Sequence, residues 1–219
     1  MVRIQNVDAS GFEMRVQEWD YLDGTHMVET VGYLVMEQGS YTLEDGTRIQ
    51  AGLVETVAGG PFQPVAFEEP FNAVPVVVTA ITSVNDAACV TGRMADLGVD
   101  GFRYGMQEQE ANTAAHAPES LAYIAWEPSS GILGDVSYVV GRTGDAVTNT
   151  SYRIDVAVPF DAPSAFLADM QTADGRDTAS LRYTDKSGTS VEVMIVEEKS
   201  KDSEMGHTSE VVGYMLFGR

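Results

Sequence analysis

The three histidines of the chain all stand in the same local sequence. Each is followed three residues later by a glutamate, as His116 is by Glu119, and an upstream glutamate and arginine recur with it. The three sets are Arg3, Glu18, His26 and Glu29; Arg93, Glu108, His116 and Glu119; and Arg182, Glu197, His207 and Glu210. Each set combines two carboxylate acceptors, a planar donor and a ring that titrates near neutral pH, so it could bind a ligand or fix a loop.

Four kinds of chemistry are open to these side chains. For a sugar, the arginine fork and the carboxylates can bind hydroxyls while a ring covers an apolar sugar face. As a structural staple, a Glu–Arg pair and a Glu–His hydrogen bond would hold the loop to the fold. A metal site is disfavoured because residues i and i+3 of an extended segment point to opposite faces. Catalysis is disfavoured because no GxSxG, phosphate-loop or dinucleotide motif is present, so we expect no enzyme, metal or cofactor.

The sets belong to an internal repeat. The arginines lie 93 − 3 = 90 and 182 − 93 = 89 residues apart, and the segment 66–81 matches 155–170. Apolar residues alternate with polar ones in FEMRVQE, FRYGMQE and VEVMIVE, which is the period of a strand. Turns rich in Asp, Asn, Ser and Gly precede these strands, and no stretch has sustained helical spacing. The pattern predicts an all-β protein of tandem antiparallel β-sandwiches with about six strands each.

The repeat predicts three units: residues 1–50, 51–138 and 139–219. The first lacks the upstream half, so we expect an incomplete sandwich whose missing strands come from a preceding part of a longer polypeptide, another subunit or a rearrangement. The segments 75–81, 33–36, 123–126 and 214–217 are apolar on both faces and are expected to be buried strands, the last three with Tyr33, Tyr123 and Tyr214 in the core.

Hairpin geometry predicts where each set gathers. A turn at 8–11 would place Arg3 across from residues 16–18, at the end to which the next loop returns His26 and Glu29. The four residues of one copy are therefore expected to cluster at one pole of their own sandwich. Glu18, Glu108 and Glu197 continue the apolar face of their strands, so each needs a partner, the Arg or His of its own copy. Trp19 stands beside this cluster in the first copy alone.

Composition limits the partners. The net charge is −20 and the pI about 4.2, which disfavours nucleic acid and anionic membranes and suits a secreted protein or a saline environment. No apolar run approaches the roughly 20 residues that span a bilayer, so we expect no membrane insertion. Cys89 is the single cysteine, which excludes an internal disulfide. We expect an extracellular, cell-surface or virion-surface location.

The middle unit resembles the H-type lectin domain. The resemblance rests on FQPVAFEEPFNAVPVVVTAI (62–81), RMADL (93–97), GVDGFRYGMQE (98–108) and SLAYIAWE (120–127), and covers 152–217 and 2–37 more loosely. It implies six-stranded sandwiches, trimers, and galactose-type sugars bound between neighbouring subunits by an Arg and a Trp–His pair. Arg93 with His116, Arg182 with His207, and Arg3 with His26 fit the Arg and, approximately, the His. The Trp survives only as Trp19, and the His lies later than in the family.

The sequence thus favours a non-enzymatic carbohydrate-binding or adhesion protein. Its sites would be the three Arg/Glu/His/Glu sets with Trp19, its ligand a glycan or polysaccharide, and its state a homo-oligomer, a trimer by resemblance, or part of a larger polypeptide. Three linked weak sites would gain by multivalency. The alternative is a structural or assembly module of an extracellular fibre, virion appendage or large adhesin without a sugar site. The trimers of the H-type lectin family further suggest that the three copies arrange around a pseudo-threefold axis within one chain.

Overall fold

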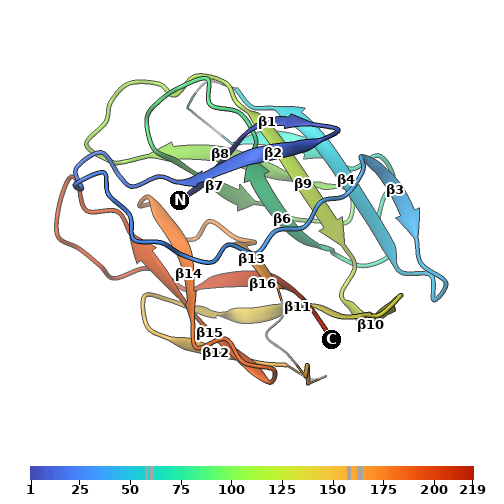
Figure 1. Cartoon of the computed structure of the whole chain (residues 1–219). Coiled ribbons are helices and arrows are strands. Elements are labelled where there is room, and N and C mark those ends of the chain that lie inside the picture. Colours follow the sequence, from blue (N-terminus) through green and yellow to red (C-terminus); the bar gives the residue numbers. More distant parts are fainter. Residues whose placement is uncertain (58, 60–61, 157–158, 162–164) are drawn as a thin grey trace.

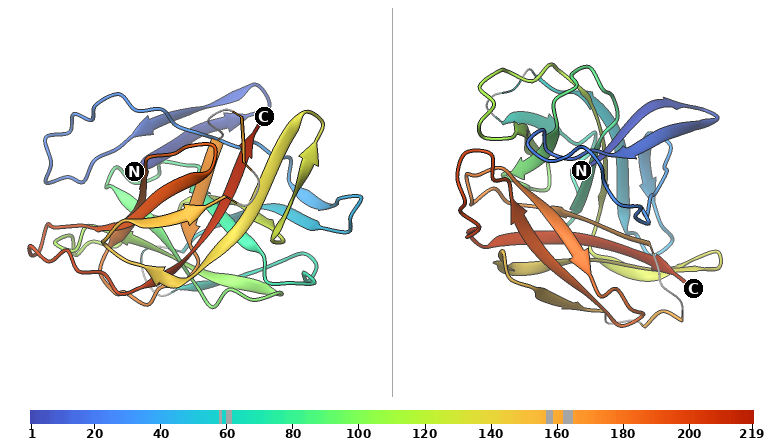
Figure 2. Two further views of the ribbon diagram at one scale, coloured as in Figure 1. Left: turned by 90° about the horizontal axis from the view of Figure 1, so that it is seen from below. Right: turned by 60° about the vertical axis from the view of Figure 1, so that its left-hand side comes forward.

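A computed structural model describes residues 1–57, 59, 62–156, 159–161 and 165–219 (Figure 1). These residues form sixteen β-strands and no helix, which confirms the all-β fold class. Parts of the expected match between 66–81 and 155–170, namely residues 157–158 and 162–164, lie outside the described residues. The first copy contributes β1 (Val2–Asp8) and β2 (Gly11–Val16), an antiparallel hairpin at one edge of the molecule (Figure 2).

Two sandwiches follow, each with seven strands in the same order. The second copy has β3 (Gly39–Thr42), β4 (Arg48–Glu55), β5 (Gln63–Ala66), β6 (Val76–Ile81), β7 (Val90–Ala95), β8 (Gly101–Glu108) and β9 (Ser120–Trp126). The third has β10 (Ser129–Leu133), β11 (Val136–Val147), β12 (Tyr152–Asp155), β13 (Ala165–Met170), β14 (Ala179–Thr184), β15 (Ser190–Glu197) and β16 (Glu210–Gly218). Each sandwich has one strand more than the expected six. This strand is β3 in the second copy and β10 in the third, and each forms a hairpin with the strand after it.

The sheets of the two sandwiches have equivalent orders. The four-stranded sheets run β3-β4-β9-β6 and β10-β11-β16-β13, and the three-stranded sheets run β5-β8-β7 and β12-β15-β14. All pairings are antiparallel. The predicted boundary after residue 50 falls within β4, and the boundary after residue 138 falls within β11. Residues 39–126 and 129–218 therefore delimit the two sandwiches.

The turns repeat as closely as the strands. Asn6, Asp96 and Asp185 have φ values of 53°, 52° and 47°, and they occupy the same position in the three copies. Asn and Asp tolerate this left-handed backbone better than other side chains, because a short polar side chain can hydrogen-bond locally. The three hairpins thus share one turn geometry, which sets the register of the strands that carry the arginines.

Each sandwich has its own core between its two sheets. In the second copy Phe102 and Tyr104 of β8 face Leu121 and Tyr123 of β9, all at most 7% exposed. In the third copy Val191, Val193, Val212 and Tyr214 take the same places. The alternation read in the sequence is the alternation between this core and the opposite face of each strand.

A third core lies between the two sandwiches, where their four-stranded sheets face each other. Trp126 of β9 packs on Tyr138 of β11 and on Phe217 of β16, with ring centroids 5.0 and 5.8 Å apart. Val76, Val78 and Met215 complete the contact and are at most 8% exposed. Strands β9 and β16 are therefore buried on both faces, which confirms the expectation for 123–126 and 214–217.

The corresponding segment of the first copy is different. Residues 33–36 are extended but belong to no strand, and Tyr33 is 60% exposed. The prediction of a buried central strand with a core tyrosine is wrong here, because β9 and β16 lie between two neighbouring strands each and the described residues place none beside 33–36. The segment crosses the front of the molecule between the loops and β3 (Figure 1).

Candidate functional site

The histidine of each copy lies between the two glutamates of its own copy. In the second copy His116 Nδ1 is 2.6 Å from Glu108 Oε1, and His116 Nε2 is 3.1 Å from Glu119 Oε1. The third copy has 2.8 and 3.2 Å for the same pairs, and the first copy 3.0 and 3.0 Å. The histidine is thus the partner that Glu108 needs, as predicted. The i and i+3 side chains converge because residues 116–119 lie outside regular strand.

The second glutamate is also held by a loop that precedes the arginine strand. Glu119 accepts hydrogen bonds from Ser83 Oγ (2.5 Å) and from the backbone N–H groups of Asn85 (2.9 Å) and Asp86 (3.3 Å). The corresponding donors to Glu210 are Thr172 Oγ1, Asp174 N and Gly175 N. Both carboxylates are 0% exposed. Buried charge is stable only when it is paired and hydrogen-bonded, as it is here.

The arginine that completes each cluster comes from the preceding copy, so the prediction of a cluster within one copy is wrong for Arg. Arg3 of the first copy lies 2.9 Å from Glu119 of the second, and Arg93 of the second lies 2.7 Å from Glu210 of the third. Arg93 also donates to the backbone carbonyls of Gly175 and Asp177 (3.2 Å each).

The physical reason for this correction lies in strand register and sheet order. Arg3 pairs with Arg15 and Arg93 with Gly105, so each arginine lies before the end of its hairpin instead of opposite the glutamate. Strand β7 is the outermost strand of its sheet. Arg93 therefore extends from an edge into the neighbouring copy, where it is 1% exposed.

The third arginine closes a ring. Arg182 of the third copy lies 3.4 Å from Glu29 of the first, so the contacts run from copy one to two, two to three and three to one. A pseudo-threefold arrangement of the copies requires this cyclic order. The closing pair differs in exposure: the Arg182 and Glu29 side chains are 54% and 48% exposed, whereas those of Arg93 and Glu210 are 0% exposed.

Hydrogen bonding favours the charged forms in these clusters. Burial alone would raise the pKa of Glu210, but the bonds it accepts from His207, Thr172 and two backbone amides lower its pKa to about 2. Burial disfavours the imidazolium of His207, yet its bonds to Glu210 and Glu197 outweigh this and raise its pKa. Hydrogen bonds to Glu18 and Glu29 likewise raise the pKa of His26. Hydrogen bonds thus favour the carboxylate form of Glu210 and the imidazolium forms of His207 and His26.

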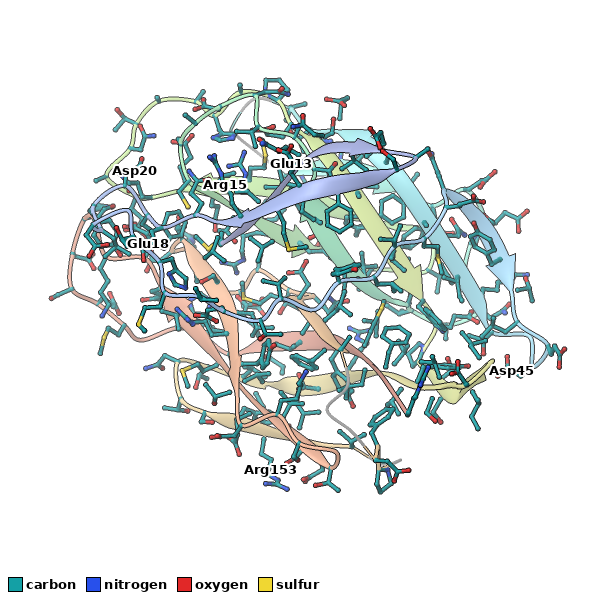
Figure 3. The ribbon with its side chains drawn as sticks, in the orientation of Figure 1. Glu13, Arg15, Glu18, Asp20, Asp45 and Arg153 are labelled. Carbon is teal, nitrogen blue, oxygen red and sulfur yellow. The ribbon has the colours of Figure 1, made fainter. Side chains whose placement is uncertain are left out.

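The remaining predicted site residues lie at the same loop-rich end. Glu18 lies there, beyond the end of β2, with Asp20 near it, and Asp45 marks the opposite end (Figure 3). Trp19 is buried, with 8% exposure. Among the described residues, Asp86, Glu108 and His116 could together approach a metal ion, with ligand atoms within 4.8 Å of one another. Both His116 ring nitrogens already face carboxylates, so a cation would have to displace one of them.

A cavity of about 240 Å³ lies beside this buried cluster. Its wall is the end of β8, the loop that follows it and Gly59 in the second copy, together with Thr178 of the third copy, and it is lined chiefly by polar side chains. These include Gln107, Glu108, Gln109, Glu110, Asn112 and Thr178. The cavity is thus a site between copies, and it is smaller than the roughly 300–1,000 Å³ of a typical small-molecule pocket.

Sequence reasoning missed the capping loops and the contacts between the sheets. Ser83 and Thr172, each a hydroxyl, are 89 residues apart and would have marked the loops as part of the repeat. Gln171 exchanges two hydrogen bonds with the backbone of Val77 in the neighbouring sandwich, at 2.9 and 2.8 Å. The residue at the Gln171 position in the second copy is Thr82, so no repeat marks this contact.

The chain is similar to Halomucin from Haloquadratum walsbyi, with 36% identity over 219 residues. The match covers 98% of this chain, which spans 2% of that relative's length. No family model matches the chain, and no solved structure matches it, so the resemblance to H-type lectins stays a prediction. The described residues contain no helix long and apolar enough to cross a membrane.

Proposed function

We propose that this chain is a non-enzymatic structural repeat module of a large extracellular or cell-surface protein. In this function the Arg–Glu–His clusters lock neighbouring repeats into a ring. The observation that carries the proposal is the pair between Arg93 and Glu210, 2.7 Å apart in different copies with both side chains fully buried. Groups sealed from solvent in this way hold repeats together and are closed to a soluble ligand.

The similarity to Halomucin supports the location. A mucin is a surface or secreted protein, and the net charge of −20 suits such a protein in a saline environment. Because three copies in one chain already supply a threefold arrangement, we propose that the chain acts within a larger polypeptide and does not form a homotrimer.

The test compares stability with binding in two cluster variants. Arg93→Ala and His116→Ala should each lower the melting temperature, because the first removes the ion-pair partner of buried Glu210 and the second removes a hydrogen-bond partner of buried Glu119. Neither should change retention on a panel of glycans and polysaccharides beyond what loss of folded protein explains. Variants that keep the melting temperature of the wild type but lose a discrete glycan signal would overturn the structural role.

A second candidate function is carbohydrate binding and adhesion, favoured by the cavity between copies. Its amide, carboxylate and hydroxyl groups are those that accept and donate to sugar hydroxyls, and its size admits one sugar ring. The resemblance to H-type lectins also implies a sugar between neighbouring units, with galactose-type sugars favoured.

The cavity can be tested without disturbing the buried clusters. Gln109→Ala and Glu110→Gln change two cavity-lining side chains that are only half-buried and do not touch the cluster side chains, and Arg153→Ala changes an exposed side chain elsewhere on the third copy. If the cavity binds sugar, a glycan screen gives discrete signals that the first two variants weaken at least about tenfold and the third leaves unchanged. Absence of any signal in the wild type would exclude the sugar site.

A further inference from the structure

The first copy holds a strand segment without strand neighbours. Alignment on Glu29, Glu119 and Glu210 places Tyr33 at the position of Tyr123, and Val35 at that of Ala125. Tyr33 and Val35 are 60% and 69% exposed, while Tyr123 and Ala125 are 7% and 0% exposed. The Tyr33 ring meets the edge of Phe12 in β2, with ring centroids 5.3 Å apart, and the rest of the sandwich face of this segment is uncovered.

The opposite face of the same segment is already packed against the core between the sandwiches. Met36 corresponds to Trp126 and, like Trp126, packs in the core between the sandwiches. A Cβ on Gly32 would lie 3.6 Å from Ala165 Cβ of β13, so the backbone runs directly over that strand. No backbone–backbone hydrogen bond among the described residues involves 30–36. The segment thus lies in the position of a central strand, with both of its edges unpaired among the described residues.

The hairpin beside it is also half covered. Met14 of β2 is 36% exposed, whereas its counterparts Tyr104 and Val193 are 2% and 0% exposed. Strands β8 and β15 each lie between two strands, but β2 pairs only with β1. An open edge and an apolar face together invite strand addition.

The cluster of Glu29, His26 and Arg182 lacks the capping loop that the other two clusters have among the described residues. Glu119 and Glu210 each accept a hydroxyl and two backbone N–H groups from a capping loop, while Glu29 has only His26 and Arg182 among the described residues. Among the described residues, Arg182 meets no counterpart of the two loop carbonyls to which Arg93 donates. The open strand edges, the exposed apolar face and the uncapped Glu29 can therefore all be satisfied by one added segment.

We propose that this face binds a segment of the same repeat, with the form of residues 129–179, donated by a further repeat of a longer chain. The inference rests on the proposed structural function. Two of its strands would flank residues 30–36, one would pair with β2, and the loop after them would cap Glu29 and Arg182. A second copy of this chain fits less well, since Val139, Ile154 and Phe166 of its own segment are buried in its own core.

The occupant has one specific sequence requirement. Tyr123 and Tyr214 each lie across from a glycine, Gly52 and Gly141, in the neighbouring strand. A Cβ on those glycines would come within 2.4 and 2.6 Å of the tyrosine side chain, closer than packing permits. The strand that pairs with Tyr33 must therefore carry glycine opposite it.

The repeat spacing defines the test. Since 182 − 3 = 179, Met1 takes the place of Ser180, and a second copy of residues 129–179 fused before Met1 continues in register. In the fusion, amide hydrogen exchange of residues 31–36 should slow at least about 100-fold, since open edges become paired. Arg182→Ala, nearly neutral in the unfused chain, should lower the melting temperature of the fusion as Arg93→Ala does.

The matched control is the same fusion with Gly141→Val in the added copy alone, which should leave residues 31–36 unprotected. Unchanged exchange in the first fusion would overturn the proposal, as would equal protection in the control. Concentration-dependent protection of 31–36 in the unfused chain would assign the face to a second copy. The effect of Arg93→Ala in the unfused chain tests the structural function separately.

Discussion

The strongest consequence of the ring is that chemically identical substitutions at Arg93 and Arg182 must differ in effect. Arg93→Ala removes the cation beside fully buried Glu210 and leaves the carbonyls of Gly175 and Asp177 without their donor. Breaking a buried ion pair from one side costs about 3–5 kcal/mol. Arg182→Ala removes a pair that is about half exposed and 3.4 Å long, which is worth no more than about 1 kcal/mol.

Urea unfolding followed by tryptophan fluorescence measures this difference. Trp126 lies in the core between the sandwiches, so its emission reports the contact that Arg93 holds, and a Trp19→Phe background removes the second fluorophore. With an m-value of about 2–3 kcal/mol/M, Arg93→Ala should lower the midpoint by about 1–2.5 M and Arg182→Ala by less than about 0.5 M. Arg93→Lys keeps the charge without the fork and should fall between them.

Equal midpoint shifts for the two alanine variants would refute the reasoning. They would mean either that Glu210 is solvated when Arg93 is removed or that the Arg182 cluster is closed in solution. The m-value separates a true stability change from loss of cooperativity.

Three further predictions concern buried groups between or within the copies. Glu210 contributes stability that is complete above its unfolded pKa of 4.5 and is lost as pH falls to about 2, a change of about 3 kcal/mol; Glu210→Gln should flatten the acid limb of a plot of melting temperature against pH. Asp169, which accepts a bond of 2.5 Å from Thr79 in the neighbouring sandwich, has a pKa raised by burial to about 6. Its ionisation therefore destabilises the fold, so stability should rise as pH falls from 7 to 5, and Asp169→Asn should reduce this rise in urea titrations to the part that the raised pKa of His207 contributes. Gln171→Ala leaves the backbone N–H and carbonyl of Val77 unpaired and should cost about 2–4 kcal/mol in the Trp126 transition, whereas an unchanged midpoint would show that water replaces the amide.

The sequence predicted the features that depend on local periodicity. Alternation in 102–107 and 191–196 gave the strands and their buried faces, and the shared slot of His26, His116 and His207 gave the His–Glu pairs. The position of the turns followed from Asp, Asn and Gly, whose backbone preferences are intrinsic.

The partner of each arginine was beyond such reasoning for a definite physical reason. In a cyclic arrangement of repeats, the arginines and the glutamates recur at the same interval along the chain. The sequence pattern therefore does not show whether an arginine pairs with the glutamate of its own copy or with that of the next copy. The pair Arg93–Glu119 and the pair Arg93–Glu210 are therefore equally compatible with the pattern, and only the packing of edge strand β7 against the third copy decides between them. The prediction that residues 33–36 form a buried strand failed for a related reason, since the burial of a strand depends on neighbouring strands that its own residues do not specify.

A double-mutant cycle between Arg93 and Glu210 tests the central claim most directly, that the clusters join different copies. Arg93→Ala, Glu210→Gln and the double variant should give a coupling energy of at least about 1 kcal/mol, while the same cycle with Glu119→Gln should be additive within about 0.5 kcal/mol. Coupling of Arg93 to Glu119 together with additivity towards Glu210 would place the cluster within one copy and contradict the ring.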